Sequence, residues 1–265
     1  MESSLDLNAY LARIGYTGSL SSTPEVLTAI HLAHASSVPF ENLDILLGRP
    51  IRIDLDSIQA KIVRARRGGY CFEQNTLLAA VLERLGFSVT RLAARVRVHD
   101  KRITARTHML LRVETDGGSW LADVGFGTGG TLVPIRLVAG SESRHGAWRH
   151  RIVHDATLWV LQELRPDGWR DLYAFTLEPQ YPIDFELANH YTSTHPNSRF
   201  TQTLVAQRMG PQGRSLLVNR NLTVELNGTV DTRTVRDDDE LLNVLKQNFG
   251  LDFPTGTRFR LPSVS

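Results

Sequence analysis

The spacing of hydrophobic positions changes once along the chain, near residue 86. Leu7, Tyr10, Leu11 and Ile14 follow the i, i+3, i+4, i+7 spacing of a helix, which predicts a helix over residues 6–15. Thr23-Pro24-Glu25 is a helix start, and Pro39 ends that second helix and makes residues 38–43 extended. Two further helices are expected, one from Asp54 or Asp56 to Gly68-Gly69 and one from Cys71 to Gly86.

Beyond Phe87 the period becomes two, which is typical of strands. Strands are expected at residues 90–98, 107–113, 120–126, 150–155, 157–164 and 169–176, forming a small antiparallel sheet or barrel. A connector over 181–200 contains a predicted helix at Asp184–Tyr191, and strands follow at 201–208, 214–219 and 221–226, with an Asn227-Gly228 hairpin turn. A final helix is capped by Asp237 to Asp239 and ends at Gly250, so the pattern predicts an α+β fold.

Composition excludes several classes of function. The 265 residues are 42% hydrophobic and 22% charged, with a net charge of +2 and no long Lys/Arg run, which argues against a nucleic-acid partner. A single cysteine excludes an intrachain disulfide and a multi-cysteine zinc site, and we expect no metal. The N-terminus lacks the features of a leader, and no apolar run is long enough for a membrane helix. We therefore expect a cytoplasmic protein with no membrane partner.

The single cysteine, Cys71, lies where a thiol can become reactive. It opens a predicted helix and follows Arg66, Arg67 and two glycines. Helix N-termini and nearby cations favour the thiolate, which is the nucleophilic form. The alternative is that Cys71 is a small buried hydrophobic residue.

Two polar residues are embedded in apolar strand sequence downstream of Cys71. His108 precedes Met-Leu-Leu, and Asp123 lies between Leu-Ala and Val. A cysteine nucleophile needs a base and an orienting partner, so Cys71, His108 and Asp123 are a candidate triad. A turn near Gly117 would place Asp123 opposite Leu111 or Arg112 rather than His108. A bulge, a strong twist or pairing through another strand must close that gap.

Several motifs in this order resemble those of the arylamine N-acetyltransferases. They are Val38-Pro39-Phe40-Glu41-Asn42-Leu43, Arg67-Gly68-Gly69-Tyr70-Cys71-Phe72-Glu73-Gln74-Asn75, Thr107-His108-Met109-Leu110-Leu111, Ala122-Asp123-Val124-Gly125-Phe126-Gly127 and His195-Pro196-Asn197-Ser198-Arg199-Phe200. The resemblance runs from about Leu5 to the final helix.

This resemblance implies a fold of three parts. They are a helical bundle over 1–86 with the nucleophile, a β-barrel over 87–185 with His108 and Asp123, and an α/β lid over 204–265 after a linker at 186–203. It implies a triad arrangement similar to that of papain-like and transglutaminase-like proteins. The implied activity is acetyl transfer from acetyl-CoA, a co-substrate, through an acetyl-cysteine to arylamines, arylhydroxylamines or hydrazines, as in xenobiotic metabolism, with no tightly bound cofactor.

The resemblance also suggests binding residues. Phe40, Val96, Phe126 and Phe200 resemble the apolar acceptor pocket of the family. Gly127, Thr128, Gly129 and Gly130 resemble its glycine loop near the CoA phosphates, where backbone N–H groups bind anions.

Other polar residues near the candidate triad have open roles. Arg67 and Glu73 can form an ion pair that supports the triad or one that only joins helix ends. His31 and His34 are interpreted as packed helix residues rather than ligands.

Other functions remain open from the sequence. An amide synthase would use a longer acyl thioester, a thiol hydrolase would release free acid, and a binding or redox-sensing scaffold would react at Cys71 without turnover. The chain is expected to be a monomer or homodimer. The sequence does not indicate the physiological acceptor.

Overall fold

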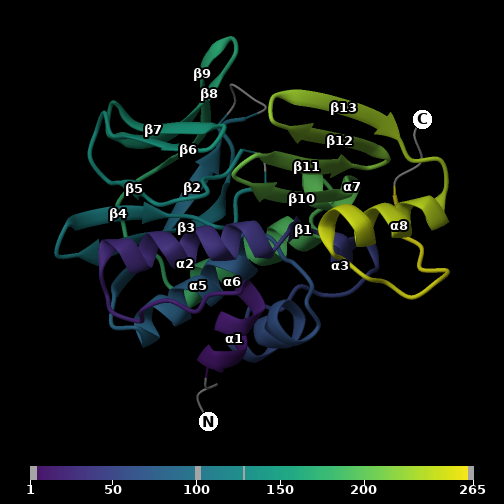
Figure 1. Cartoon of the computed structure of the whole chain (residues 1–265), viewed down its shortest axis with the longest axis horizontal. Helices are drawn as coiled ribbons and strands as arrows, with labels where there is room; N and C mark the ends of the chain where they lie inside the picture. Colours follow the sequence, from purple (N-terminus) through teal and green to yellow (C-terminus); the bar gives the residue numbers. More distant parts are fainter. Residues whose placement is uncertain (1–4, 99–102, 128, 262–265) are drawn as a thin grey trace.

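The protein has an α+β fold, in which helices of the N-terminal third pack beneath two antiparallel sheets (Figure 1). The computed structural model describes residues 5–98, 103–127 and 129–261. The predicted fold class is confirmed. Over the described residues, no helix combines the length and the hydropathy needed to cross a membrane.

Helices dominate the N-terminal third. They are α1 (Leu7–Ile14), α2 (Pro24–Ser37), α3 (Leu43–Leu46), α4 (Leu55–Ile58), the π-helix η1 (Gln59–Arg64) and α5 (Cys71–Arg84). Of these, α1, α2 and α4 begin directly after side chains that cap them, namely Asp6, Thr23 and Asp54. The Thr23 hydroxyl accepts a hydrogen bond from the Val26 N–H, and Pro24 occupies the first position of α2. Leu27 and Ile30 of α2 are fully buried in one core with Leu78 of α5.

The third predicted helix differs from its prediction, because it is a short α-helix that widens into a π-helix. The wider turns of η1 accompany a contact from α1, where the Arg13 guanidinium donates to the Ile62 carbonyl at 2.9 Å. The extended segment predicted over 38–43 is confirmed in part: Phe40–Glu41 forms β1, whereas Leu43 already begins α3, a short helix that the sequence did not predict.

The larger sheet forms a nearly closed barrel of eight strands. They are β2 (Ser88–Val96), β3 (Arg106–Thr115), β4 (Gly118–Ala122), β5 (Ile135–Arg136), β6 (Glu142–His145), β7 (Trp148–Asp155), β8 (Leu158–Arg165) and β9 (Gly168–Phe175). Their order is β5-β4-β3-β2-β9-β8-β7-β6, all neighbours are antiparallel, and the two edge strands contact each other. The sequence did not predict the short strands β5 and β6, and the strand expected over 120–126 already ends at Ala122.

The smaller sheet combines C-terminal strands with one strand from the N-terminal third. Its order is β1-β10-β11-β12-β13, where β10 is Val205–Gly210, β11 Gly213–Val218, β12 Asn221–Leu226 and β13 Thr229–Thr234. β1 pairs with β10 through Phe40–Gln207 and Glu41–Ala206. Helix α8 (Asp238–Phe249) covers this sheet with a buried apolar face (Figure 1).

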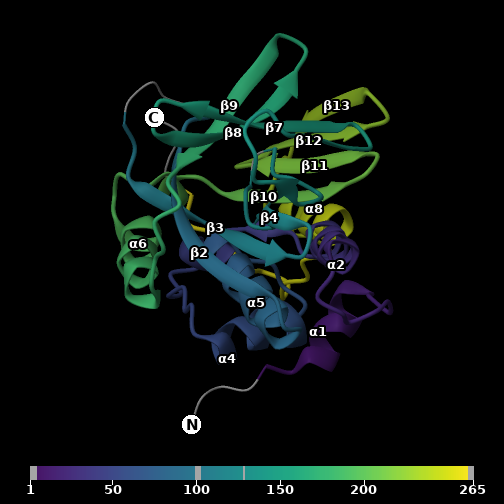
Figure 2. The same ribbon diagram turned by 90° about the vertical axis from the view of Figure 1, so that its left-hand side faces the viewer.

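Two helices connect the barrel to the smaller sheet. They are α6 (Pro182–Thr194) and α7 (Arg199–Gln202). Figure 2 separates α6 from α1 and α2, with α5 between them. The division into 1–86, 87–185, 186–203 and 204–265 stays a prediction.

Candidate active site

Cys71 is held at the first position of α5 by a glycine turn that packs against β1. A Cβ atom on Gly68 would lie 2.1 Å from the Pro39 carbonyl oxygen, so only glycine fits there without displacing backbone. The Gly69 carbonyl accepts from the Glu41 N–H at 3.0 Å, and Phe40 forms a parallel bridge with Gly69. The thiol is buried and lies 3.7 Å from the Thr107 carbonyl oxygen. The sequence order Gly-Gly-Tyr-Cys therefore fixes the nucleophile next to β1 and β3.

His108 and Asp123 meet beyond the last residue pair of their strands. The β3–β4 ladder ends at Leu111–Ala122, and Asp123 follows as the chain leaves β4. On its other side, β3 shifts register against β2 between Ala94–His108 and Arg95–Arg106, which leaves Thr107 as the extra residue of a bulge. The Nε2 atom of His108 lies 2.7 Å from Oδ2 of Asp123. Strand pairing alone would leave an offset between His108 and Asp123. The offset is closed because the chain leaves β4 after Ala122, next to the bulge in β3.

The carboxylate of Asp123 fixes both the tautomer and the charge of His108. A carboxylate only accepts hydrogen bonds, so Nε2–H donates and Nδ1 is left for the thiol side. Burial disfavours a charged imidazole, but Asp123, followed by contact with Cys71, raises the pKa of His108 from 6.5 to about 10. Burial acts against ionisation of Asp123, yet the charge of His108 and its hydrogen bond lower the pKa of Asp123. Both groups are therefore charged at neutral pH.

Asp123 is also oriented by donors that the sequence analysis did not assign. Its Oδ1 atom accepts from Asn75 Nδ2 at 2.9 Å and from the Gly125 N–H at 3.0 Å. Asn75 lies one helical turn after Cys71 on α5, which is why the two residues share a site. The ring of Tyr173 lies 4.8 Å from the ring of His108, and burial, followed by the Asp123 charge, raises the pKa of Tyr173.

A cleft of about 510 Å³ opens above Cys71 and His108. The four residues expected in an apolar pocket, Phe40, Val96, Phe126 and Phe200, all line it. The rings of Phe40 and Phe200 lie 5.9 Å apart, and Phe126 packs edge-on against His108 at 5.0 Å. Further residues that were not expected in the pocket also line it, namely Val98, Ile103, Thr104, Ala105, Thr107, Gly125, Tyr191, Thr192, Asn197, Ser198, Arg199 and Val205. No carboxylate lines this cleft over the described parts of the chain.

Among the described residues of the glycine loop, one lines the cleft. Gly127 lines it, and a Cβ at this position would lie 2.4 Å from the Phe40 ring. Gly129 instead packs against Glu163, its carbonyl accepting from His150 Nε2 at 2.7 Å, and Gly130 packs against Phe126. Thr128 lies outside the described residues. The assignment of this loop to CoA phosphates stays a prediction.

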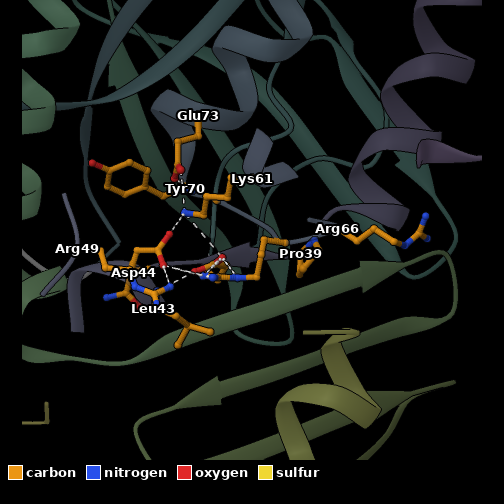
Figure 3. Close-up of polar contacts among 12 residues, drawn as sticks. Pro39, Leu43, Asp44, Arg49, Lys61, Arg66, Tyr70 and Glu73 are labelled. Carbon is orange, nitrogen blue, oxygen red and sulfur yellow. Dashed lines mark hydrogen bonds and ion pairs between the residues drawn. The ribbon is translucent and has the colours of Figure 1, made fainter. Parts of the chain in front are cut away.

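The expected ion pair between Arg67 and Glu73 is replaced by a larger network. Arg67 binds Glu41 at 2.7 Å and Asp44 at 3.3 Å, whereas Glu73 binds Lys61 at 2.8 Å. Lys61 also reaches Asp44 at 3.0 Å, so it joins the two halves of the network (Figure 3). The expectation was wrong because Glu73 turns back to accept from the Tyr70 N–H at the start of α5.

Replacing Lys61 by methionine is expected to destabilise the protein strongly. Lys61 is mostly buried among the carboxylates of Glu41, Asp44 and Glu73, and their charges raise its pKa despite the cost of burial. Removing one partner from a buried ion network typically costs about 3–5 kcal/mol. Urea unfolding of the variant measures this loss in the free energy of unfolding.

Lys246→Met is the matched control, because the Lys246–Asp252 pair is exposed. Such a pair contributes about 0–1 kcal/mol. Equal effects of the two substitutions would show that the Lys61 network does not stabilise the fold.

Comparisons with known proteins give one consistent result. A sequence model of a family described as N-acetyltransferase matches residues 23–257. The arylamine N-acetyltransferase of Mycolicibacterium smegmatis is 41% identical over 259 residues, which cover 94% of this chain and 92% of that protein. The solved structure of the Nocardia farcinica arylamine N-acetyltransferase is 42% identical, with a TM-score of 0.88 over 94% of this chain and 90% of that one. The Mycobacterium marinum arylamine N-acetyltransferase, solved in complex with CoA, is 34% identical, with a TM-score of 0.87 over 92% of each chain.

Proposed function

The chain belongs to the arylamine N-acetyltransferase family, and we propose on this basis that it moves an acetyl group from acetyl-CoA to an arylamine through an acetyl-cysteine at Cys71. One observation carries the proposal: a buried His108–Asp123 pair, 2.7 Å apart, lies beside Cys71 at the base of an aromatic cleft. The complex of the M. marinum relative with CoA supports CoA as the acetyl carrier.

In the first half-reaction, the thiolate of Cys71 attacks the thioester carbonyl carbon of acetyl-CoA. The bond from that carbon to the CoA sulfur breaks, and the imidazolium of His108 supplies the proton that CoA takes as it leaves as a thiol. Asp123 stabilises the imidazolium beforehand and keeps Nδ1 directed toward the sulfur.

In the second half-reaction, a neutral arylamine attacks the acetyl-cysteine carbonyl. His108, now neutral, takes the amine proton through Nδ1, and the Cys71 thiolate departs. Phe40, Phe126 and Phe200 offer aromatic faces to a flat ring and limit the access of water that would hydrolyse the acyl-enzyme. Arylhydroxylamines and hydrazines present the same kind of neutral nucleophile.

Residues 204–265 are the proposed lid over this chemistry. Val205 of this segment lines the cleft, as does Phe200 of the preceding linker. Gly127 remains the candidate for contact with CoA at the cleft.

We retain the cytoplasm as the proposed location, because a reducing compartment preserves a free reactive thiol.

Intact-protein mass spectrometry with acetyl-CoA alone tests the proposed function. We expect one acetyl group, mapped to Cys71 by peptide digestion, which is lost stoichiometrically when an arylamine is added. Transfer to the amine without an acetylated intermediate would contradict the mechanism. Release of free acetate without amine would favour a hydrolase, and faster reaction with a longer acyl thioester would favour an amide synthase.

Alkylation of Cys71 by iodoacetamide is expected to remain fast in mild acid. His108 holds its charge below its pKa of about 10, so the imidazolium is present throughout this range and is lost only as the pH rises through about 10. A free thiol with a pKa of about 8.5 reacts roughly 100-fold more slowly at about pH 6 than at about pH 8.5. For this protein we expect the two rates to agree within about tenfold.

His108→Gln is the control for this profile, because it removes the imidazolium and retains a polar side chain. Its alkylation rate should follow that of a free thiol. A wild-type profile that already matches the free thiol would rule out the ion pair.

A further inference from the structure

Asp123 lies at a position where the sheet no longer supports its backbone. The β3–β4 pairing ends at Leu111–Ala122, so the next N–H along the chain needs an acceptor from elsewhere. His31 of α2 supplies it, because the Asp123 N–H donates to His31 Nε2 at 3.0 Å. A residue of α2 therefore supplies the backbone acceptor that strand pairing no longer provides at Asp123, the residue whose carboxylate binds His108.

The second ring nitrogen of His31 fixes which atom is the acceptor. Nδ1 lies 3.0 Å from the carbonyl oxygen of Leu132, and a carbonyl only accepts, so Nδ1 carries the proton. Nε2 then has a free lone pair for the Asp123 N–H. Burial lowers the pKa of the fully buried His31 to about 4, opposed by the hydrogen bond to Leu132 and by Asp123, so the ring is neutral at physiological pH.

These two hydrogen bonds close the base of one loop. Asp123 and Leu132 stand at the two ends of the segment that contains Phe126 and Gly127, both of which line the cleft. His31 therefore acts on the main chain of Asp123, while Asn75 and Gly125 hold its side chain.

We propose that His31 is a positioning residue of the acetyl-transfer site, which holds the Asp123 backbone so that its carboxylate stays aligned with His108. The proposal rests on the triad chemistry proposed above. It assigns a role to a histidine that the sequence alone indicates only as a packed helix residue.

Two conservative substitutions separate the two hydrogen bonds of His31. In His31→Gln, the new side chain places an amide oxygen near the position of Nε2 and can still accept from the Asp123 N–H. His31→Asn places an amide nitrogen near the position of Nδ1 and retains only the bond to Leu132. If His31 acts through Asp123, His31→Gln should behave like wild type and His31→Asn should not.

The ratio of Cys71 alkylation rates at about pH 6 and about pH 8.5 is the primary readout, because it reports the imidazolium–thiolate pair. We expect His31→Asn to lower this ratio about tenfold and His31→Gln to change it less than about twofold. The kcat/KM for acetyl transfer should fall by up to about 100-fold in His31→Asn, as for a small misplacement of a catalytic group.

His34→Leu is the matched control for a purely structural effect. His34 lies on the same helix, is fully buried, and bonds Tyr10 at 2.9 Å and Gln74 at 3.3 Å. This variant should lower the melting temperature without changing the alkylation ratio. Equal alkylation ratios in His31→Asn and His31→Gln, or an unchanged ratio in His31→Asn, would overturn the proposal.

A measurement on the unmodified protein covers the case in which His31→Asn does not fold. Nitrogen NMR of histidine-labelled protein should show His31 as the neutral Nδ1–H tautomer from about pH 5 to about pH 9. A protonated ring or the Nε2–H tautomer would overturn the proposal. Neither the NMR nor the alkylation assay requires acetyl transfer, so failure of the proposed activity would be recognised separately.

Discussion

Cys71→Ala is expected to abolish acetyl transfer, with a loss of about 10⁵–10⁶-fold in kcat as for other enzyme nucleophiles. The cause is chemical, because alanine has no atom that can accept the acetyl group. The side chain is small, and its sulfur contacts only the Thr107 carbonyl and His108 among the interactions described above, so the fold should persist. The acetylated enzyme should be undetectable by mass, and transfer to an arylamine should fall to background.

Two measurements make this result specific. The variant should still bind CoA by calorimetry and should retain its helical circular dichroism, which excludes unfolding as the cause. Activity within tenfold of wild type would mean that the acetyl group passes directly from CoA to the amine.

Asp123→Asn is expected to lower kcat by about 10³–10⁴-fold, although the two residues have nearly the same shape. Asn75 Nδ2 and the Gly125 N–H both donate to Oδ1 of Asp123, so the amide oxygen of the variant must occupy that position. Its NH₂ group then faces His108 Nε2. Nε2 must accept, which moves the ring proton to Nδ1 and removes the lone pair that faces the thiol side.

In the same variant, the rate of Cys71 alkylation should fall in mild acid, because the carboxylate that stabilises the imidazolium is gone. Asp155→Asn is the control, since Asp155 forms an exposed pair with Arg97. A kcat for Asp123→Asn within tenfold of the control would show that the tautomer of His108 does not depend on Asp123.

Local signals in the sequence predict the longer helices and the three residues of the candidate triad. Thr23 and Pro24 mark the start of α2 because capping acts within a few residues. Cys71, His108 and Asp123 were recognisable because each is unusual in its own segment. All four expected pocket residues line the cleft, although that expectation came from resemblance to a family rather than from spacing.

The partners of these residues could not be predicted, because they depend on contacts between distant segments. Glu41 and Arg67 are separated by 26 residues, and Lys61 was not distinguishable from a surface lysine. His31 contacts Asp123 across 92 residues, and nothing in its local sequence shows which of its ring nitrogens is used. The meeting of His108 and Asp123 required the register of β3 and β4, which an apolar alternation does not determine.

The short strand β1 has a consequence for the order of events during synthesis. Its two residues pair with β10, and Asn42 beside it donates to the carbonyls of Phe200 and Thr203. A ribosome-bound chain that has emerged only to residue 200 does not yet contain β10. It therefore lacks the strand that fixes β1, against which the Gly68-Gly69 turn packs. Domains form as their residues emerge, so we expect α5 to form early and the cleft above Cys71 to form late. A nascent chain would then carry its thiol for much of translation without the ability to acetylate an amine.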